Sequence, residues 1–177
     1  MVVGSTWYSS IREAPYIPDW IEEAAKRLKE EEEKRQQILR KKQQLERETV
    51  LTNSREVFDL FLSTVERDVG KFNEHFPENE RRLQKLERVD DSTFTVRRRY
   101  TPSYTLSVKF DPLVPNITYE IDRPNVLDGQ IYSQPGDFGF RLLTNGNVSL
   151  VNGADSITVE EASREVLLPA LEGLASW

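Results

Sequence analysis

The chain has 177 residues, with 24 Lys or Arg, 30 Asp or Glu, one His and no Cys. The lack of cysteine excludes a disulfide framework, Cys-ligated zinc, an iron–sulfur cluster and a thiol nucleophile, and a single histidine excludes a His-rich metal site within one chain. The formal net charge of -6 argues against a protein whose whole surface binds nucleic acid. Because no run of about eighteen apolar residues occurs, the sequence predicts no transmembrane helix.

Charge is distributed unevenly along the chain. Residues 1–52 hold 10 basic and 10 acidic side chains, whereas residues 90–177 hold 7 basic and 12 acidic ones. This shift indicates a neutral, highly charged first third and an acidic second half. Residues 1–18 lack the basic start and the apolar run of a secretory signal. We therefore expect a cytoplasmic protein that begins with an extended arm over 1–18.

Residues 19–52 have the composition of a long polar helix. From Asp19 to Thr52 there is no Gly or Pro, and 17 of the 27 residues from 22 to 48 are charged. In four pairs a Glu precedes a basic residue at i, i+4, an order that stabilises an isolated helix by roughly 0.2–0.5 kcal/mol per pair. A sustained coiled coil needs apolar a and d positions over three or four heptads, and segment 29–37 interrupts that pattern.

Two interpretations of this charged helix stay open. One is a solvated helix whose two ends touch something, and the other is a short coiled coil or helical hairpin formed with a partner chain. In either case a helix that is polar on most sides serves to reach a partner, which is another protein or a second copy of the chain. The candidate partner-binding residues are its sparse apolar side chains: Trp20, Ile21, Leu28, Ile38, Leu39 and Leu45.

The remainder, 53–177, is predicted to form an α+β domain. Asn53 resembles a helix cap with Glu56 three residues later, so we expect a second, amphipathic helix to begin there and to end at Pro77. Its apolar face recurs at helical spacing and suits burial against a sheet. The members of that face are Phe58, Phe61, Leu62, Val65, Val69, Phe72 and Phe76.

Alternating apolar residues then predict an antiparallel meander of five to seven strands. The clearest strands are 93–100, 104–110, 117–121, 138–142 and 148–150, and their short connections permit hairpins rather than parallel crossovers. Segment 82–89 reads as a further strand or as the end of a helical segment. Segment 122–137, which contains Pro124, Gly129, Pro135 and Gly136, is expected to be an irregular loop with at most a short strand at 130–132.

A final helix is predicted to close the domain against the sheet. Thr158 and Glu161 form a capping-box signal, and an apolar face follows. Pro169 lies inside this segment and is expected to kink the helix or to shorten its first part.

Few residues point to catalysis. The chain has no phosphate-binding glycine loop, no zinc-protease motif and no nucleophile elbow, so we expect a protein that is not an enzyme and has no cofactor and no metal. His75 is expected to cap a helix or lie on the surface. Asp90, Asp91 and Asp111 are read as turn residues, because Asp favours local turn geometry.

Arg98 is the most informative charged residue. Strand alternation places it on the apolar face of its strand, where a charge must pair or bind something. We expect a snorkelling side chain or a salt bridge to Glu66 or Glu165. The alternative is an anion site in which Arg98, with Tyr100 and Tyr104 nearby, binds a phosphate or carboxylate.

Together these features predict a non-enzymatic protein-interaction or assembly module. The α+β domain is the binding body, and the charged helix serves oligomerisation or partner docking. An acidic chaperone or adaptor is one form of this function. The alternative is a small-ligand sensor that holds a phosphorylated or anionic ligand through Arg98.

Overall fold

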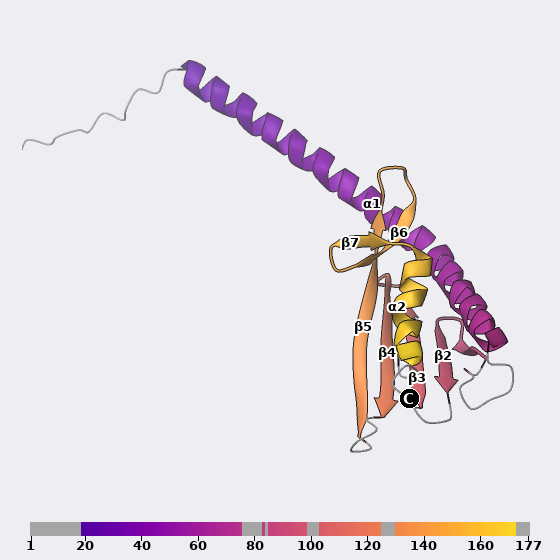
Figure 1. Ribbon diagram of the computed structural model, residues 1–177. Coiled ribbons are helices and arrows are strands. Elements are labelled where there is room, and N and C mark those ends of the chain that lie inside the picture. Colours follow the sequence, from indigo (N-terminus) through magenta and orange to yellow (C-terminus); the bar gives the residue numbers. More distant parts are fainter. Residues whose placement is uncertain (1–18, 76–82, 84, 99–102, 125–129, 173–177) are drawn as a thin grey trace, which may run out of the picture. The chain divides into compact units, whose positions relative to one another are not determined.

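The computed structural model describes residues 19–75, 83, 85–98, 103–124 and 130–172 (Figure 1). Its elements follow the order α1, β1 to β7, α2, so the α+β class, with a long N-terminal helix, an antiparallel sheet and a closing helix, is confirmed. The chain divides into two compact units, Met1–Gln43 and Gln44–Trp177. The extended arm expected over 1–18 lies outside the described residues.

Helix α1 spans Asp19–His75 without a break, so the second helix start expected at Asn53 is wrong. The polar side chains at this point bond backwards along the helix instead of capping a new one. Asn53 Nδ2 donates to the Thr49 carbonyl at 3.0 Å, and Ser54 Oγ donates to the Leu51 carbonyl at 3.2 Å. Such residues bond equally well to the preceding turn or to the following N–H groups, which is why the local signal was ambiguous.

The apolar stripe predicted from Phe58 to Phe76 is confirmed as the core face of α1 as far as the partly buried Phe72, and Phe76 lies outside the described residues. Phe58, Phe61 and Val65 are fully buried there. The Phe58 ring stacks on Phe110 of the sheet with centroids 4.9 Å apart, and Phe61 meets Phe138 edge-on at 6.0 Å. Each such side chain contributes roughly 1.5–3 kcal/mol by leaving water, so this half of α1 is held by tertiary packing.

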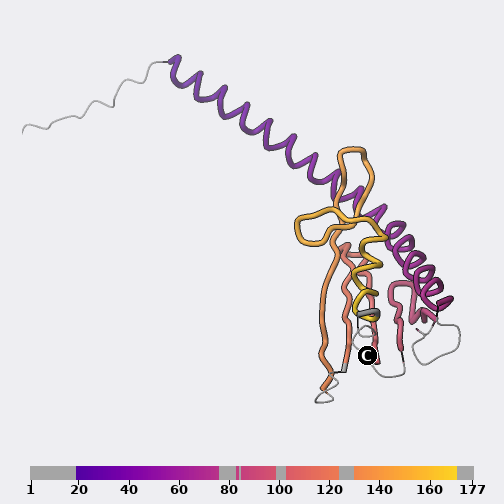
Figure 2. Tube along the Cα trace, viewed as in Figure 1, coloured from indigo at the N-terminus to yellow at the C-terminus, as the bar shows by residue number. Residues whose placement is uncertain are grey.

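Seven antiparallel strands form one sheet in which every strand pairs with its neighbours in sequence. Figure 2 lets the reader follow this meander along the chain. Segment 82–89 was predicted to be a further strand or the end of a helical segment. From residue 87 on it is an edge strand. The strands are β1 Glu87–Asp90, β2 Thr93–Arg98, β3 Tyr104–Asp111, β4 Asn116–Pro124, β5 Ile131–Leu142, β6 Val148–Asn152 and β7 Asp155–Ile157.

The two faces of the sheet differ in polarity. In β3, Tyr104, Leu106, Val108 and Phe110 are buried, and the residues between them are more exposed. The buried set faces the core residues of α1 and α2, since Phe110 contacts Phe58 and Tyr104 bonds to the backbone of α2. The helices therefore cover one face, and the other is polar, as clean alternation predicts.

The irregular loop expected over 122–137 is wrong for most of its length. Strand β4 continues to Pro124 and β5 begins at Ile131, while 125–129 lie outside the described residues. Pro135 is compatible with a strand here because β6 pairs only with residues 139–142 of β5. Residue 135 therefore has no paired strand on that side, and proline is tolerated where one side of a strand is unpaired. Gly136 fits because a Cβ there would lie 2.2 Å from Cζ of Tyr119, so only glycine leaves room for the ring.

Helix α2 spans Val159–Glu172, and its predicted cap is confirmed. The Thr158 N–H donates to Glu161 Oε2 at 2.8 Å, and the Glu161 N–H donates to Thr158 Oγ1 at 3.1 Å. The bonds that the Thr158 N–H and the Thr158 hydroxyl donate to Glu161 Oε2 hold the pKa of the Glu161 carboxyl below its ordinary value, the backbone bond contributing most. Pro169 lies inside the helix and does not end it, which corrects the expectation of a shortened helix.

Candidate functional site

Arg98 and Tyr104 form a polar anchor under the C-terminal part of α2. They are directly opposite each other on β2 and β3, and they are 3% and 1% exposed. Arg98 Nη1 donates a hydrogen bond to the Ala170 carbonyl at 2.8 Å, and the Tyr104 hydroxyl donates to the Val166 carbonyl. Two side chains of the sheet therefore donate to backbone carbonyls of the helix, and the Ala170 carbonyl lies in the last turn, where carbonyls have no partner within the helix.

The charge of Arg98 suits this position. The carbonyl end of a helix carries a partial negative charge that stabilises a cation. Burial lowers the pKa of the guanidinium and raises the pKa of the Tyr104 hydroxyl, because desolvation disfavours the charged form of each. The inward direction expected for Arg98 is confirmed by its burial. Tyr100, the third residue of the proposed anion site, lies outside the described residues.

Glu165, one of the two carboxylates expected to pair with Arg98, belongs to a second polar cluster. Its Oε1 accepts from the Tyr119 hydroxyl at 2.8 Å, and its Oε2 accepts from Asn152 Nδ2 at 2.8 Å. Burial and the neighbouring Glu165 carboxylate both raise the pKa of the Tyr119 hydroxyl. Sequence reasoning missed this cluster, although a glycine inside a strand pattern, here Gly136, signals a close approach of another group.

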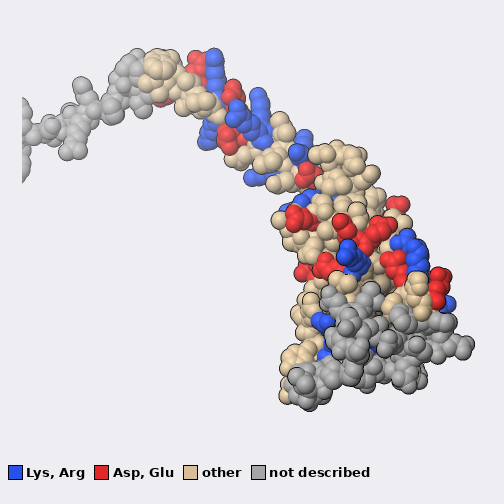
Figure 3. All heavy atoms as spheres, viewed as in Figure 1, with Lys and Arg blue, Asp and Glu red and all other residues tan. Residues whose placement is uncertain are grey.

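The six candidate partner-binding residues on α1 are all exposed in the described part of the chain. The exposed fraction ranges from 41% for Ile21 to 69% for Trp20. Lys, Arg, Asp and Glu lie between them in a mixture of both signs, and Figure 3 shows the blue and red side chains interspersed along this helix. An ion pair at i, i+4, with Arg27 Nη2 at 2.7 Å from Glu23 Oε1, lies between two of the apolar positions.

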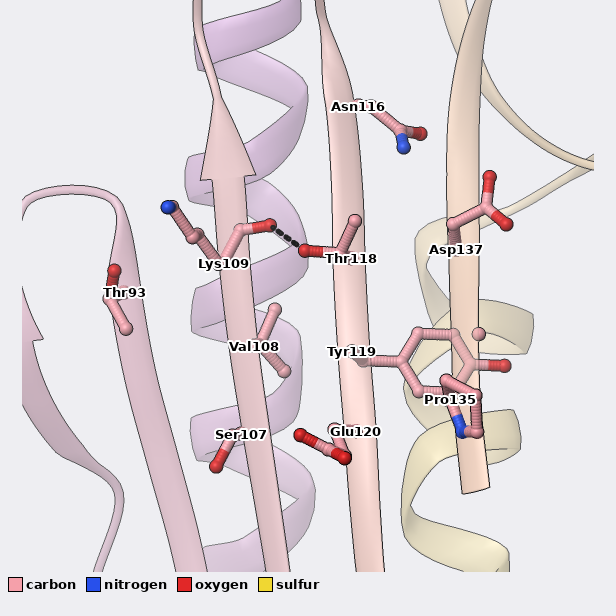
Figure 4. Close-up of a pocket in the computed structure, with 11 residues that line it drawn as sticks. Thr93, Ser107, Val108, Lys109, Asn116, Thr118, Tyr119, Glu120, Pro135 and Asp137 are labelled. Carbon is pink, nitrogen blue, oxygen red and sulfur yellow. Dashed lines mark hydrogen bonds between the residues drawn. The ribbon is translucent and has the colours of Figure 1, made fainter. Parts of the chain in front are cut away.

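The polar face of the sheet carries an open depression of about 850 Å³. Figure 4 shows this face with the helices behind the strands. Its charged lining side chains are Lys109, Glu120 and Asp137, and Thr118 Oγ1 donates to the Lys109 carbonyl at 3.4 Å. With one cation and two carboxylates spread over three strands, the depression concentrates neither sign of charge.

The acidic residues at strand ends have structural partners. Asp90 Oδ1 accepts from the Ser92 N–H at 2.7 Å, and Asp111 Oδ1 accepts from the Leu113 N–H at 2.9 Å. Each carboxylate therefore stabilises the turn that follows it in the chain. His75 is the exposed last residue of α1. Within the described residues, no three His, Asp or Glu side chains are grouped so that they could hold a metal ion. Neither described helix has a stretch long and apolar enough to cross a membrane.

Comparisons with protein-family models, with curated proteins and with solved structures found no match to this chain. The functional argument therefore rests on the residues of the chain itself.

Proposed function

We propose that the protein is a non-enzymatic interaction or assembly module that docks a protein partner through the charged half of α1. The partner is another protein or a second copy of the chain. The domain formed by the sheet, α2 and the C-terminal half of α1 is the body of the module. A cytoplasmic location is part of this proposal.

One observation carries the proposal: large apolar side chains recur along α1 and remain exposed. Burying a side chain of the size of Leu or Ile contributes roughly 1.5–3 kcal/mol. Leu28, Ile38 and Leu45 are each at least 64% exposed, so most of that contribution is still available for docking. The intervening charges keep the undocked helix in solution.

The experiment replaces one apolar side chain and one polar neighbour with the same charged residue. Ile38→Asp places a carboxylate among the apolar positions, whereas Gln37→Asp places it one residue away, about 100° around the helix. We expect the wild-type chain and Gln37→Asp to keep their partner or their self-association in pull-downs from the source cells and in sedimentation, and Ile38→Asp to lose both. Equal behaviour of all three chains would overturn the proposed function.

A further inference from the structure

Four exposed apolar residues of α1, Ile21, Leu28, Ile38 and Leu45, lie on the a and d positions of one heptad pattern whose centre is charged. Taking Ile21 as position a, the a positions are Ile21, Leu28, Arg35 and Lys42, and the d positions are Ala24, Glu31, Ile38 and Leu45. All eight lie on one continuous helix, and every one except the half-buried Ala24 is exposed. A line of a and d positions is the seam along which two helices pair.

The charge of the helix suits a second copy of the same chain. Residues 19–52 contain nine basic and nine acidic side chains, so two copies of this segment meet without net repulsion, although the whole chain carries -6. A strongly acidic or strongly basic partner gains nothing from a segment of zero net charge. The central charged layers, Glu31 and Arg35, then decide the orientation of the two copies.

We propose that two copies of the chain pair through this seam as an antiparallel coiled coil centred between Glu31 and Arg35. This inference rests on the proposed function and names its partner. In an antiparallel pair each a position faces a d position of the other helix. In the proposed register the numbers of two facing residues add up to about 66. Leu28 then faces Ile38 of the second copy, and Ile21 faces Leu45. At the centre, Glu31 of each copy faces Arg35 of the other.

The parallel arrangement places like charges in the seam. There Glu31 faces Glu31, Arg35 faces Arg35 and Lys42 faces Lys42, and each of these layers repels. The charged residues beside the seam favour the parallel orientation. In a parallel pair Arg27 would reach Glu32 of the other helix, whereas in an antiparallel pair Lys34 meets Lys34. Flanking charges remain in water and count for less than charges within the seam, so the central Glu–Arg layers prevail.

The first experiment tests whether these charges meet between chains. Sedimentation equilibrium of the full chain is expected to give twice the monomer mass of 20.6 kDa. Glu31→Arg and Arg35→Glu each create like-charge layers and are expected to weaken self-association roughly tenfold, which corresponds to about 1.4 kcal/mol. An equimolar mixture of the two variants restores opposite charges and is expected to restore association. Glu31 and Arg35 are also four residues apart on one helix, and each variant places like charges at this i, i+4 spacing. Mixing does not change the spacing within a chain, so rescue reports contacts between chains.

The second experiment tests the orientation and uses the absence of cysteine from the chain. Leu28→Cys and Ile38→Cys are prepared separately and oxidised alone and as a mixture. The antiparallel seam predicts a disulfide-linked dimer in the mixture and little with Leu28→Cys alone. Cross-linking of Leu28→Cys to itself, without a mixed product, would show a parallel pair and overturn the inference.

The outcomes separate this inference from the proposed function. A chain that stays monomeric at all concentrations, yet keeps a different protein in a manner that depends on Ile38, refutes the second copy and leaves the proposed function standing. A monomer that keeps no partner through Ile38 refutes both.

Discussion

Arg98 carries a positive charge into a site where it is almost fully buried, and its geometry explains why this is tolerated. The desolvation that lowers its pKa is offset by the Ala170 carbonyl at 2.8 Å and by the negative end of α2. Tyr104 adds a second bond to the same helix. The pair therefore ties the C-terminal part of α2 to strands β2 and β3 of the sheet.

This role gives a prediction that also separates an anchor from a ligand site. Arg98→Ala removes a charged hydrogen bond and leaves a buried carbonyl without its donor, so we expect the free energy of unfolding to fall by about 2–3 kcal/mol. Arg97→Ala, on the exposed side of the same strand, is the control and is expected to change it by no more than about 0.5 kcal/mol. Urea denaturation measures both.

A pure ligand site would give the reverse result. Arg98→Ala would then leave the unfolding free energy of the unliganded protein equal to that of Arg97→Ala, and would remove a thermal shift caused by anionic ligands.

At the scale of the element, β5 shows how a strand can contain residues that usually break strands. Its residues 131–138 pair with β4 on one side only among the described strands, which suits Pro135. Its Gly136 is required by a neighbouring side chain and not by the backbone, since no positive φ is found there. The Tyr119 ring occupies the space above it and reaches Glu165 of α2.

We therefore predict opposite effects for two glycine-to-alanine changes. Gly136→Ala places a methyl group against the Tyr119 ring and is expected to lower stability by about 1–3 kcal/mol, as overpacking does. Gly70→Ala, in α1, meets no atom within 4 Å and is expected to raise stability by about 0.5–1 kcal/mol, because alanine is the better helix former. Thermal unfolding of the two variants beside the wild type gives the sign of each change. A neutral Gly136→Ala would show that the ring does not need this space.

At the scale of the whole molecule, two groups of described apolar residues have different environments. One group is a core built from residues 58–69 of α1, the inner face of the sheet and α2, and its central side chains have no exposure. The other group is the exposed apolar set of α1 between Trp20 and Leu45. The first group stabilises the fold, and the second is available for association.

This division predicts that the two groups respond differently to substitution. Phe61→Ala empties a fully buried site and is expected to cost about 3–5 kcal/mol of folding stability. Leu39→Lys is expected to change stability by less than about 0.5 kcal/mol when unfolding is measured at a concentration where the chain is monomeric. A large loss with Leu39→Lys under those conditions would mean that this side chain belongs to the core.

Several features were determined by the sequence alone because they depend on local periodicity. The stripe on 58–69, the alternation in β3 and the Thr158–Glu161 cap all follow from spacing along the chain, which the same residues impose wherever they pack. The inward direction of Arg98 follows from the same alternation. The class of fold, the strand pairing of neighbours and the polar helix were therefore open to prediction.

Other features were decided only by the tertiary structure. Asn53 and Ser54 have the side chains to start a helix, and their bonds to Thr49 and Leu51 show that α1 continues through them. Pro135 and Gly136 resemble a loop until the Tyr119 ring and the one-sided pairing of β5 are known. Arg98 donates to a backbone carbonyl 72 residues away. At β5 and at Arg98 a contact with a residue distant in sequence selects one of the arrangements that the local sequence permits, whereas Asn53 and Ser54 bond to the preceding turn of their own helix.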